Sequence, residues 1–490
     1  MKRFFLFSLS IFFSLFIILL IPVAKIAKPF LPFAEYLLGV DEPTSYLILL
    51  GNDAEMRANG GFAGSYAKIV IARSEGDLPA GRQARQSIPL LDRHALLAMT
   101  NLNSEISFQD IYVPNGQIAG LFVKPPEPIQ QAFGHGTWEL ANADWEPDFP
   151  SSAKTLRWFL EKGGEINPDI LAILNLSTIK RILSLVGSFS VPEYSATLTP
   201  DNLYLFLQGK AELNFFPGST QKKDALTAVG NALAKKIKSL SFIQKLRIAQ
   251  ILYTDFINQN IMVHSTNLSF QSLLEQKKLA GVFQPEAFDT YAMIETNLGA
   301  NKANAFITRS TTHVIARRSP EATDAAIYTN NSIHHAVTIQ FQNSSLEANP
   351  NPPLHYGGNY IAYLRLYIPE NAQNISLSRT PEGTPPLPEE SPRQVVLQGD
   401  SSLDSTLKIS YGLTEIGFWH TTLAGGESTI TLSYTLPCDL SLRAERGNLT
   451  PPCPYSLAIL KQHGLVSSPQ TISLFGQPLA TNLTQSFYSP

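Results

Sequence analysis

Apolar and polar residues follow two different patterns along this chain, and the change falls near residue 285. Before it, strand-like apolar runs are mixed with segments whose apolar residues recur every three or four positions, as in amphipathic helices. After it, short segments alternate between apolar and polar residues and end at Pro, Asn or Gly, which is typical of half-buried antiparallel strands. We therefore expect a mixed α/β or α+β domain over residues 44–285 and an all-β sandwich over residues 290–485.

Individual elements can be placed from the same patterns. Strands are expected at 45–50, 65–72, 304–315, 334–343, 360–369 and 427–437, and helices at 151–164, 220–240 and 241–260. His334 and His335 fall within one of these strands, where neighbouring side chains point to opposite faces. This favours one buried and one surface histidine over a shared metal site.

The N-terminus carries a long apolar run. Residues 4–24 contain no charge, and a helix of this length spans a bilayer core of roughly 30 Å. Its length, and the lack of a small-x-small cleavage site, favour an uncleaved anchor; a cleaved signal peptide is the alternative. We expect a cytoplasmic tail at 1–3, a transmembrane segment at 4–24 and a juxtamembrane linker at 25–43.

The orientation of the anchor follows less directly from charge. Lys2 and Arg3 before the run nearly balance Lys25 and Lys28 after it under the positive-inside rule. We expect a single-pass protein of the cell membrane with the bulk of the chain outside the cytoplasm. The two cysteines, Cys438 and Cys453, agree with an oxidising compartment if they form a disulfide, and two free buried thiols are the alternative.

Overall composition is that of an ordinary globular protein. The net charge is −3, with 16% charged and 44% hydrophobic residues, so nothing favours a nucleic-acid partner. The motifs of common hydrolases, metalloproteases and nucleotide enzymes are missing, and no cluster with metal-ligand spacing stands out. Two Ala-, Arg- and Pro-rich stretches, near 78–86 and 316–327, are either short genomic insertions or ordinary surface loops.

One polar stretch, residues 51–64, separates the first two expected strands and is predicted to be a loop. Its glycines permit close approach of backbone, and its Arg could grip an anion in two-pronged geometry. The other interpretation is a structural ion pair between Glu55 and Arg57 that holds an irregular β connection. The candidate ligand-binding residues are Asn52, Glu55, Arg57, Gly60, Gly61 and Gly64.

These residues carry a resemblance to a known family. The stretch YLILLGNDAEMRANGGFAGSYAKIVI resembles the signature of the bacterial domain of unknown function 4012, with an Asn-x-x-Glu-x-Arg element followed by Gly-Gly-Phe-x-Gly-Ser. Ala58 and Asn59 depart from the pair that the family usually shows there. The resemblance implies a single-anchor, extracytoplasmic bacterial protein and no established activity.

The order of elements is also similar, more distantly, to the LytR-CpsA-Psr proteins, membrane-anchored transferases that move lipid-diphosphate-linked glycans onto peptidoglycan. For this chain the likeness implies a fold with a sheet and covering helices, and Mg²⁺ only if it is a transferase. We expect a binding protein of the cell envelope, with an envelope glycan or a polyprenyl-diphosphate lipid as partner, and a transferase as the alternative. The chain offers Arg57, Arg73, Asp92, Arg93, Asp144 and Asp148 as equivalents of the arginines and aspartates of those enzymes, but none matches a full motif, so no catalytic residue is assigned.

Overall fold

A computed structural model describes most of the chain. The described residues are 28–73, 102–118, 120–134, 136–212, 220–317, 332–345, 357–380, 406–437 and 455–489. Within these ranges no helix is both long and apolar enough to cross a membrane. The expected anchor at 4–24, both cysteines and the stretch 78–86 lie outside the described residues, as does all of 316–327 except its first two residues.

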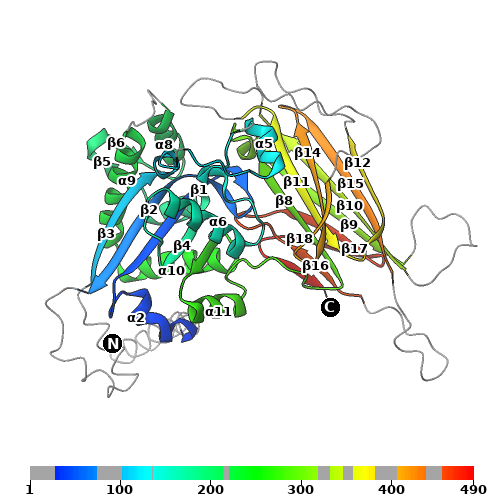
Figure 1. Cartoon of the computed structure of the whole chain (residues 1–490), viewed down its shortest axis with the longest axis horizontal. Coiled ribbons are helices and arrows are strands. Elements are labelled where there is room, and N and C mark those ends of the chain that lie inside the picture. The colour runs from blue at the N-terminus through cyan, green and yellow to red at the C-terminus, as the bar shows by residue number, and fades with distance from the viewer. Residues whose placement is uncertain are drawn as a thin grey trace, which may run out of the picture.

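The first part of the chain is built on a mixed five-stranded sheet with the order β3-β2-β1-β4-β7 (Figure 1). The strands are β1 (Thr44–Arg57), β2 (Gly60–Arg73), β3 (Leu102–Asp110), β4 (Ile170–Asn175) and β7 (Ile261–Ser265). β1 pairs with β2 in antiparallel and with β4 in parallel orientation. The strands expected at 45–50 and 65–72 lie within β1 and β2, and they pair directly, with Leu50 opposite Ser65.

Helices cover both faces of this sheet. Leu47 and Leu171 face the core with Phe159 of α6, whereas Tyr46 and Ile170 face the other side with Phe270 of α11. The longer helices are α6 (Phe149–Lys162), α7 (Leu176–Val186), α8 (Leu203–Glu212), α9 (Gln221–Lys238), α10 (Phe242–Ile257) and α11 (Leu268–Gln276). The three helices expected from the sequence are confirmed as α6, α9 and α10.

Shorter elements connect these helices and strands. They are η1 (Lys28–Phe33), α2 (Ala34–Leu37), α4 (Tyr112–Gly116), α5 (Glu127–Phe133), η4 (Leu140–Asn142), β5 (Phe189–Val191), η5 (Pro192–Tyr194), β6 (Ala196–Leu198) and η6 (Ala303–Phe306). η1 and α2 pack against α11, since Phe30, Phe33 and Tyr36 contact the ring of Phe270.

The C-terminal part is β-rich, as the alternating pattern predicts. Two six-stranded sheets, ordered β12-β15-β10-β9-β17-β18 and β13-β14-β11-β8-β16-β19, enclose one apolar core that includes Val337 and Leu432 of the first sheet and Leu364 and Phe418 of the second. The strands are β8 (Asp289–Asn297), β9 (Ile307–Ala316), β10 (Ser332–Asn343), β11 (Tyr360–Pro369), β12 (Gln373–Thr380), β13 (Thr406–Ser410), β14 (Leu413–Thr422), β15 (Glu427–Pro437), β16 (Leu457–Leu460), β17 (Pro469–Leu474), β18 (Gln477–Asn482) and β19 (Phe487–Ser489). In β10, His335 is fully buried against Asp289, whereas His334 is partly exposed.

The prediction of a loop at 51–64 is wrong. β1 continues to Arg57 and β2 begins at Gly60, so only Ala58 and Asn59 form the turn of a long β-hairpin. Two register shifts, after Leu50 and after Asn52, absorb the polar insertion without ending the strands. The sequence suggests a loop because strand interiors rarely contain so many polar residues and glycines. In this hairpin, the polar residues and the glycines are needed for close packing.

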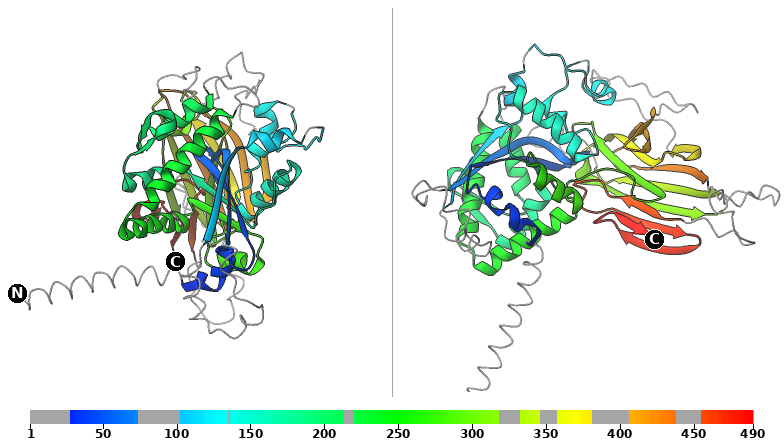
Figure 2. Two further views of the ribbon diagram at one scale, coloured as in Figure 1. Left: turned by 90° about the vertical axis from the view of Figure 1, so that its left-hand side faces the viewer. Right: turned by 60° about the horizontal axis from the view of Figure 1, so that its bottom comes forward.

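The tip of this hairpin is buried between the two parts of the chain, which lie side by side in Figure 2. A second junction lies nearby, where Arg365 of β11 donates to the carbonyl oxygen of Trp145 at 2.7 Å and stacks on its indole ring at 4.4 Å. The β-rich part therefore packs against the hairpin and the first sheet and is not a separate module joined only by a linker.

Candidate functional site

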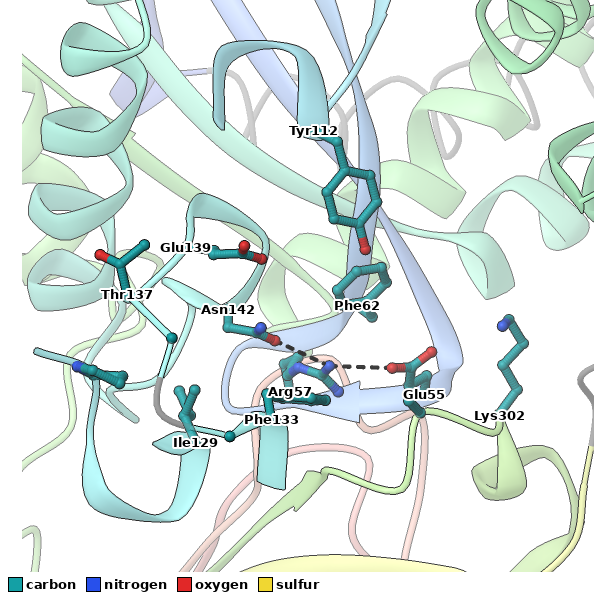
Figure 3. Close-up of a pocket in the computed structure, with 14 residues that line it drawn as sticks. Glu55, Arg57, Phe62, Tyr112, Ile129, Phe133, Thr137, Glu139, Asn142 and Lys302 are labelled. Carbon is teal, nitrogen blue, oxygen red and sulfur yellow. Dashed lines mark hydrogen bonds and ion pairs between the residues drawn. The ribbon is translucent and has the colours of Figure 1, made fainter. Parts of the chain in front are cut away.

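A pocket of about 370 Å³ lies beside the hairpin tip. Most of its wall comes from β1, β2 and the segment from α4 to η4, and the β-rich part closes it with Ala300 and Lys302 (Figure 3). The lining residues are Glu55, Arg57, Phe62, Tyr112, Pro125, Ile129, Phe133, Gly134, Gly136, Thr137, Glu139, Asn142, Ala300 and Lys302. Two of the six residues singled out from the sequence, Glu55 and Arg57, are among them.

Glu55 and Arg57 form an ion pair in the wall of this pocket. Arg57 Nη2 lies 3.1 Å from Glu55 Oε1, and the two side chains are only 3% and 6% exposed. Arg57 also donates to Asn142 Oδ1 at 3.3 Å and to the carbonyl oxygen of Asn297 at 2.5 Å, and its guanidinium lies 4.9 Å from the ring centre of Phe62. Within the described part of the chain, the buried Arg57 Nε has no hydrogen-bond partner.

The rest of the lining is a mixture of aromatic and polar groups. Tyr112 is 46% exposed as a residue, yet its hydroxyl points into the pocket toward Phe62 (Figure 3). Desolvation, and then the nearby carboxylate of Glu55, raise the pKa of Tyr112 to about 12, so the phenol remains a hydrogen-bond donor at neutral pH. Glu139 adds a second carboxylate to the wall.

The other four predicted site residues build the hairpin and do not line this pocket. Asn52 Oδ1 accepts a hydrogen bond from Ala54 N within the irregular part of β1. Gly61 N donates to Asn175 Oδ1 at 2.9 Å, and Gly60 packs against the same side chain. The carbonyl oxygen of Gly64 accepts from Lys222 Nζ at 2.5 Å. A ligand-binding role for any of the six residues stays a prediction.

Of the described residues offered for the transferase alternative, Arg57 lines the pocket and the others do not. Asp144 accepts from Asn59 Nδ2 at 2.6 Å, and burial raises the pKa of this carboxyl group. Asp148 caps α6 and also accepts from Phe283 N. Arg73 lies at the far end of β2 from the turn, while Asp92 and Arg93 are outside the described residues. Nowhere in the described ranges do three His, Cys, Asp or Glu side chains form a group that could hold a metal ion.

Comparison with known protein families finds a match to the segment that contains the hairpin and most of the pocket wall. Residues 41–211 match the DUF4012 family, described as "Protein of unknown function". The match includes the Asn-x-x-Glu-x-Arg and Gly-Gly-Phe elements, so the resemblance suggested by those residues is confirmed. No curated protein matches the chain.

Solved structures give weaker likenesses. B. subtilis TagV shares 13% identity over 49% of this chain and 80% of its own, with a TM-score of 0.26. The Lin1025 protein from Listeria innocua shares 13% identity over 51% and 85%, with a TM-score of 0.25. Protein gbs0355 from Streptococcus agalactiae shares 13% identity over 51% and 76%, with a TM-score of 0.28. These scores are too low to assign a fold or a function.

The hairpin of the DUF4012 segment is held by residues far outside it, which the sequence did not single out. After β16, Gln462 Nε2 donates to the carbonyl oxygens of Arg57 and Glu295, each at 2.9 Å. His463 Nδ1 lies 2.8 Å from Asn59 Oδ1, and because Asn59 Oδ1 can only accept, the histidine carries its proton on Nδ1. A Lys-Gln-His-Gly tetrapeptide has no periodicity or motif that would have indicated this role.

Lys461 of the same tetrapeptide is also buried. Its Nζ donates to the carbonyl oxygens of Leu465 at 2.7 Å and Gln462 at 3.1 Å, and lies 3.3 Å from Asn260 Oδ1. Burial lowers the pKa of Lys461 to about 7, and the carboxylate of Asp255 offsets part of this effect. Burial and then the neighbouring Lys461 lower the pKa of His463 to about 3.

Proposed function

We propose that this chain is a membrane-anchored, extracytoplasmic protein that binds an envelope glycan bearing an anionic group in the Glu55–Arg57 pocket. The observation that carries the proposal is Arg57 itself. Its guanidinium is almost fully buried and lies in the wall of a cavity. An anionic group in this cavity would lie close to a cation in a poorly hydrated setting, where the attraction between opposite charges is stronger than in water.

The size and lining of the pocket suit a sugar. Its volume of about 370 Å³ is within the roughly 300–1,000 Å³ typical of small-molecule sites. Phe62 and Tyr112 offer aromatic surface to the apolar face of a sugar ring, while Glu139 and Asn142 offer acceptors and donors to its hydroxyl groups. The long tail of a polyprenyl lipid would lie outside this volume.

Glycan transfer by a LytR-CpsA-Psr-like mechanism is the second candidate, and it is less well supported. Such a reaction requires carboxylates that place a divalent metal on a diphosphate. Among the described residues, only Glu55 and Glu139 supply carboxylates to the pocket wall, and Glu55 is already paired with Arg57. Asp144 and Asp148 are occupied in holding the hairpin turn and α6.

Binding can be tested on the full chain in nanodiscs, with a phosphorylated envelope glycan fragment and undecaprenyl diphosphate as separate probes, each with and without Mg²⁺. Glu139→Gln and Tyr112→Phe change hydrogen bonding in the pocket while keeping side-chain shape. We expect the double variant to weaken glycan binding by about tenfold or more, because Tyr112→Phe removes a hydroxyl donor, worth roughly 1.4 kcal/mol, and Glu139→Gln makes a charged acceptor a weaker neutral one. Its melting temperature should stay that of the natural chain.

Glu161→Gln on the exposed face of α6 serves as the matched control and should bind normally. Full glycan affinity in the pocket variant would refute this site. In a separate assay, Mg²⁺-dependent transfer from undecaprenyl-diphosphate-linked glycan to added peptidoglycan, with release of the polyprenyl diphosphate carrier, would favour the transferase instead. For compartment, an alkaline phosphatase fused to the C-terminus should be active, and an inactive fusion beside a fluorescent cytoplasmic reporter would reverse the topology.

A further inference from the structure

The corner between α9 and α10 exposes two large apolar side chains. Phe242 is 62% and Ile243 is 52% exposed at the first turn of α10. The corner has a defined shape, because Ser241 and Gln244 form a reciprocal capping box and Lys245 Nζ donates to the carbonyl oxygen of Lys238 at 3.0 Å. The two apolar side chains therefore protrude from an ordered part of the fold.

Basic residues surround this apolar tip. Between residues 225 and 254 the chain contains no Asp or Glu. Ile243 and Arg247 are four positions apart on α10 and thus lie on one face. In the part of the chain that the structure describes, none of the basic residues at this corner forms a salt bridge. These cations are Lys235, Lys236, Lys238, Lys245 and Arg247.

The corner lies at the end of the sheet where the chain enters from its N-terminus. α9 begins beside Gly64 and Asp110, where Lys222 contacts both, and runs about 27 Å (18 residues) toward the opposite end of the sheet. α10 leads through residues 258–260 into β7, and Phe256 and Ile257 near its end pack in the apolar cluster that also holds Phe30 and Tyr36. At that same end, Tyr36 of α2 lies 2.9 Å from Ser265 of β7. Figure 1 shows α2 at this edge.

This position is close to the proposed anchor. Only three residues separate the uncharged run ending at Ala24 from Lys28, where the described structure begins. Such a connection reaches at most roughly 14 Å even when fully extended. If residues 4–24 span the bilayer, this end of the sheet faces the membrane surface.

We infer that the α9–α10 corner docks onto the anionic phospholipid surface, with Phe242 and Ile243 inserted among the headgroups and the five basic residues facing lipid phosphates. An apolar tip within a basic patch is the arrangement that binds an anionic membrane interface. The inference rests on the proposed anchor and adds a second contact that fixes how the protein stands on the membrane. The pocket is thereby held in one orientation relative to the lipid surface.

The test uses the full chain in vesicles with an environment-sensitive fluorophore on Ile243→Cys. The unsubstituted chain gives the background from the natural cysteines, and Leu407→Cys, at a 59% exposed position of β13, is the matched control. In vesicles with anionic lipid, the label at residue 243 should shift to the blue and be quenched by lipid-borne nitroxides. The label at residue 407 should do neither.

Charge supplies the second arm of the test. Lys235→Gln, Lys238→Gln and Lys245→Gln together should weaken docking by about a hundredfold, since each basic residue near an anionic surface contributes about fivefold. Neutral lipid or high salt should also reduce quenching. A chain released by a carbonate wash overturns the anchor. If the chain is retained but the label at residue 243 is not quenched, the docking alone is overturned. A blue shift that depends only on protein concentration also overturns the docking, because it would indicate contact with a second copy of the chain.

Discussion

Gln462 donates a hydrogen bond from its side-chain amide to the main-chain carbonyl of Arg57, at 2.9 Å and across 405 residues of sequence. The same amide group donates to the carbonyl oxygen of Glu295 and accepts from its backbone N–H. One buried side chain thus connects the hairpin tip, strand β8 and the segment after β16. The wall of the pocket depends on this three-way contact because Arg57 is part of that wall.

Replacing Gln462 by Ala should therefore destabilise the protein as a whole. The change leaves two carbonyl groups and one N–H group buried without partners, and we expect the free energy of unfolding to fall by about 1–3 kcal/mol or more. Denaturant unfolding measures the loss. Gln250→Ala at an exposed position of α10 is the control and should have little effect. Equal stability of the two variants would show that the contact does not hold the parts together.

The ion pair of Glu55 and Arg57 provides a second stability prediction. Arg57→Met leaves the Glu55 carboxylate buried without its partner, and we expect a loss of roughly 3–5 kcal/mol in the free energy of unfolding. Adding Glu55→Gln to this variant should recover part of the loss, because the unpaired charge is then removed. Lys68→Met breaks the more exposed pair with Glu165 and should cost under about 1 kcal/mol. If Arg57→Met and Lys68→Met lower the free energy of unfolding by similar amounts, the Glu55–Arg57 pair does not behave as a buried ion pair.

A third prediction concerns the close packing of the hairpin strands. A side-chain methyl at Gly61 would fall on the backbone of Asn52 and Asp53. Because backbone atoms cannot move aside without breaking the pairing of β1 with β2, Gly61→Ala should cost several kcal/mol or prevent folding. Gly116→Ala is the matched control, since nothing lies within 4 Å of the added methyl there. A well-folded Gly61→Ala variant with an unchanged melting temperature would contradict this packing.

The fourth prediction concerns pH. Burial lowers the pKa of Lys461 to about 7, whereas an unfolded lysine has a pKa of about 10.4. Between these values the unfolded chain holds a proton that the folded chain lacks, so this group makes stability rise with pH, by at most about 1.4 kcal/mol per unit. Below pH 7 both states are protonated and the slope from Lys461 disappears.

Lys461→Met should remove that slope. The stability of the variant relative to the natural chain should be highest near pH 7 and decline toward pH 10. Unfolding measured across this range detects the change, and Lys245→Met, at an exposed position, should leave the slope as it is. Parallel stability curves for Lys461→Met and the natural chain would mean that the lysine is not held in a dry environment.

Much of the fold follows from local patterns. Apolar periodicity places α9, α10 and the strands of the β-rich part, because each element buries one face and exposes the other. The pairing of β1 with β2 follows from two apolar runs close in sequence. The Glu55–Arg57 pair was one of two interpretations of the polar stretch, and the structure shows the pair in the wall of a pocket.

The remainder depends on contacts between residues far apart in sequence. Asn175 and Gln462 supply the partners that let a glycine-rich, polar segment persist as strands to Arg57, and neither residue lies in a recognisable motif. The carboxylates of Asp144 and Asp148 suggested chemistry by their type, but their hydrogen bonds show structural roles. Residue type alone cannot distinguish a structural carboxylate from a catalytic one, because the role depends on which groups surround the side chain after folding.

The position of Gln462 and His463 near the end of the chain also constrains the order of assembly. Synthesis proceeds from the N-terminus, so the hairpin tip and the pocket wall exist as sequence long before their last supports have been made. β16 pairs with β8 and leads into those two residues, so the bonds from Gln462 to the Arg57 carbonyl and from His463 to Asn59 form after the other partners of the hairpin tip have been made. A chain that stops before residue 457 would carry all the lining residues of the pocket and still lack two of the side chains that hold its wall in place.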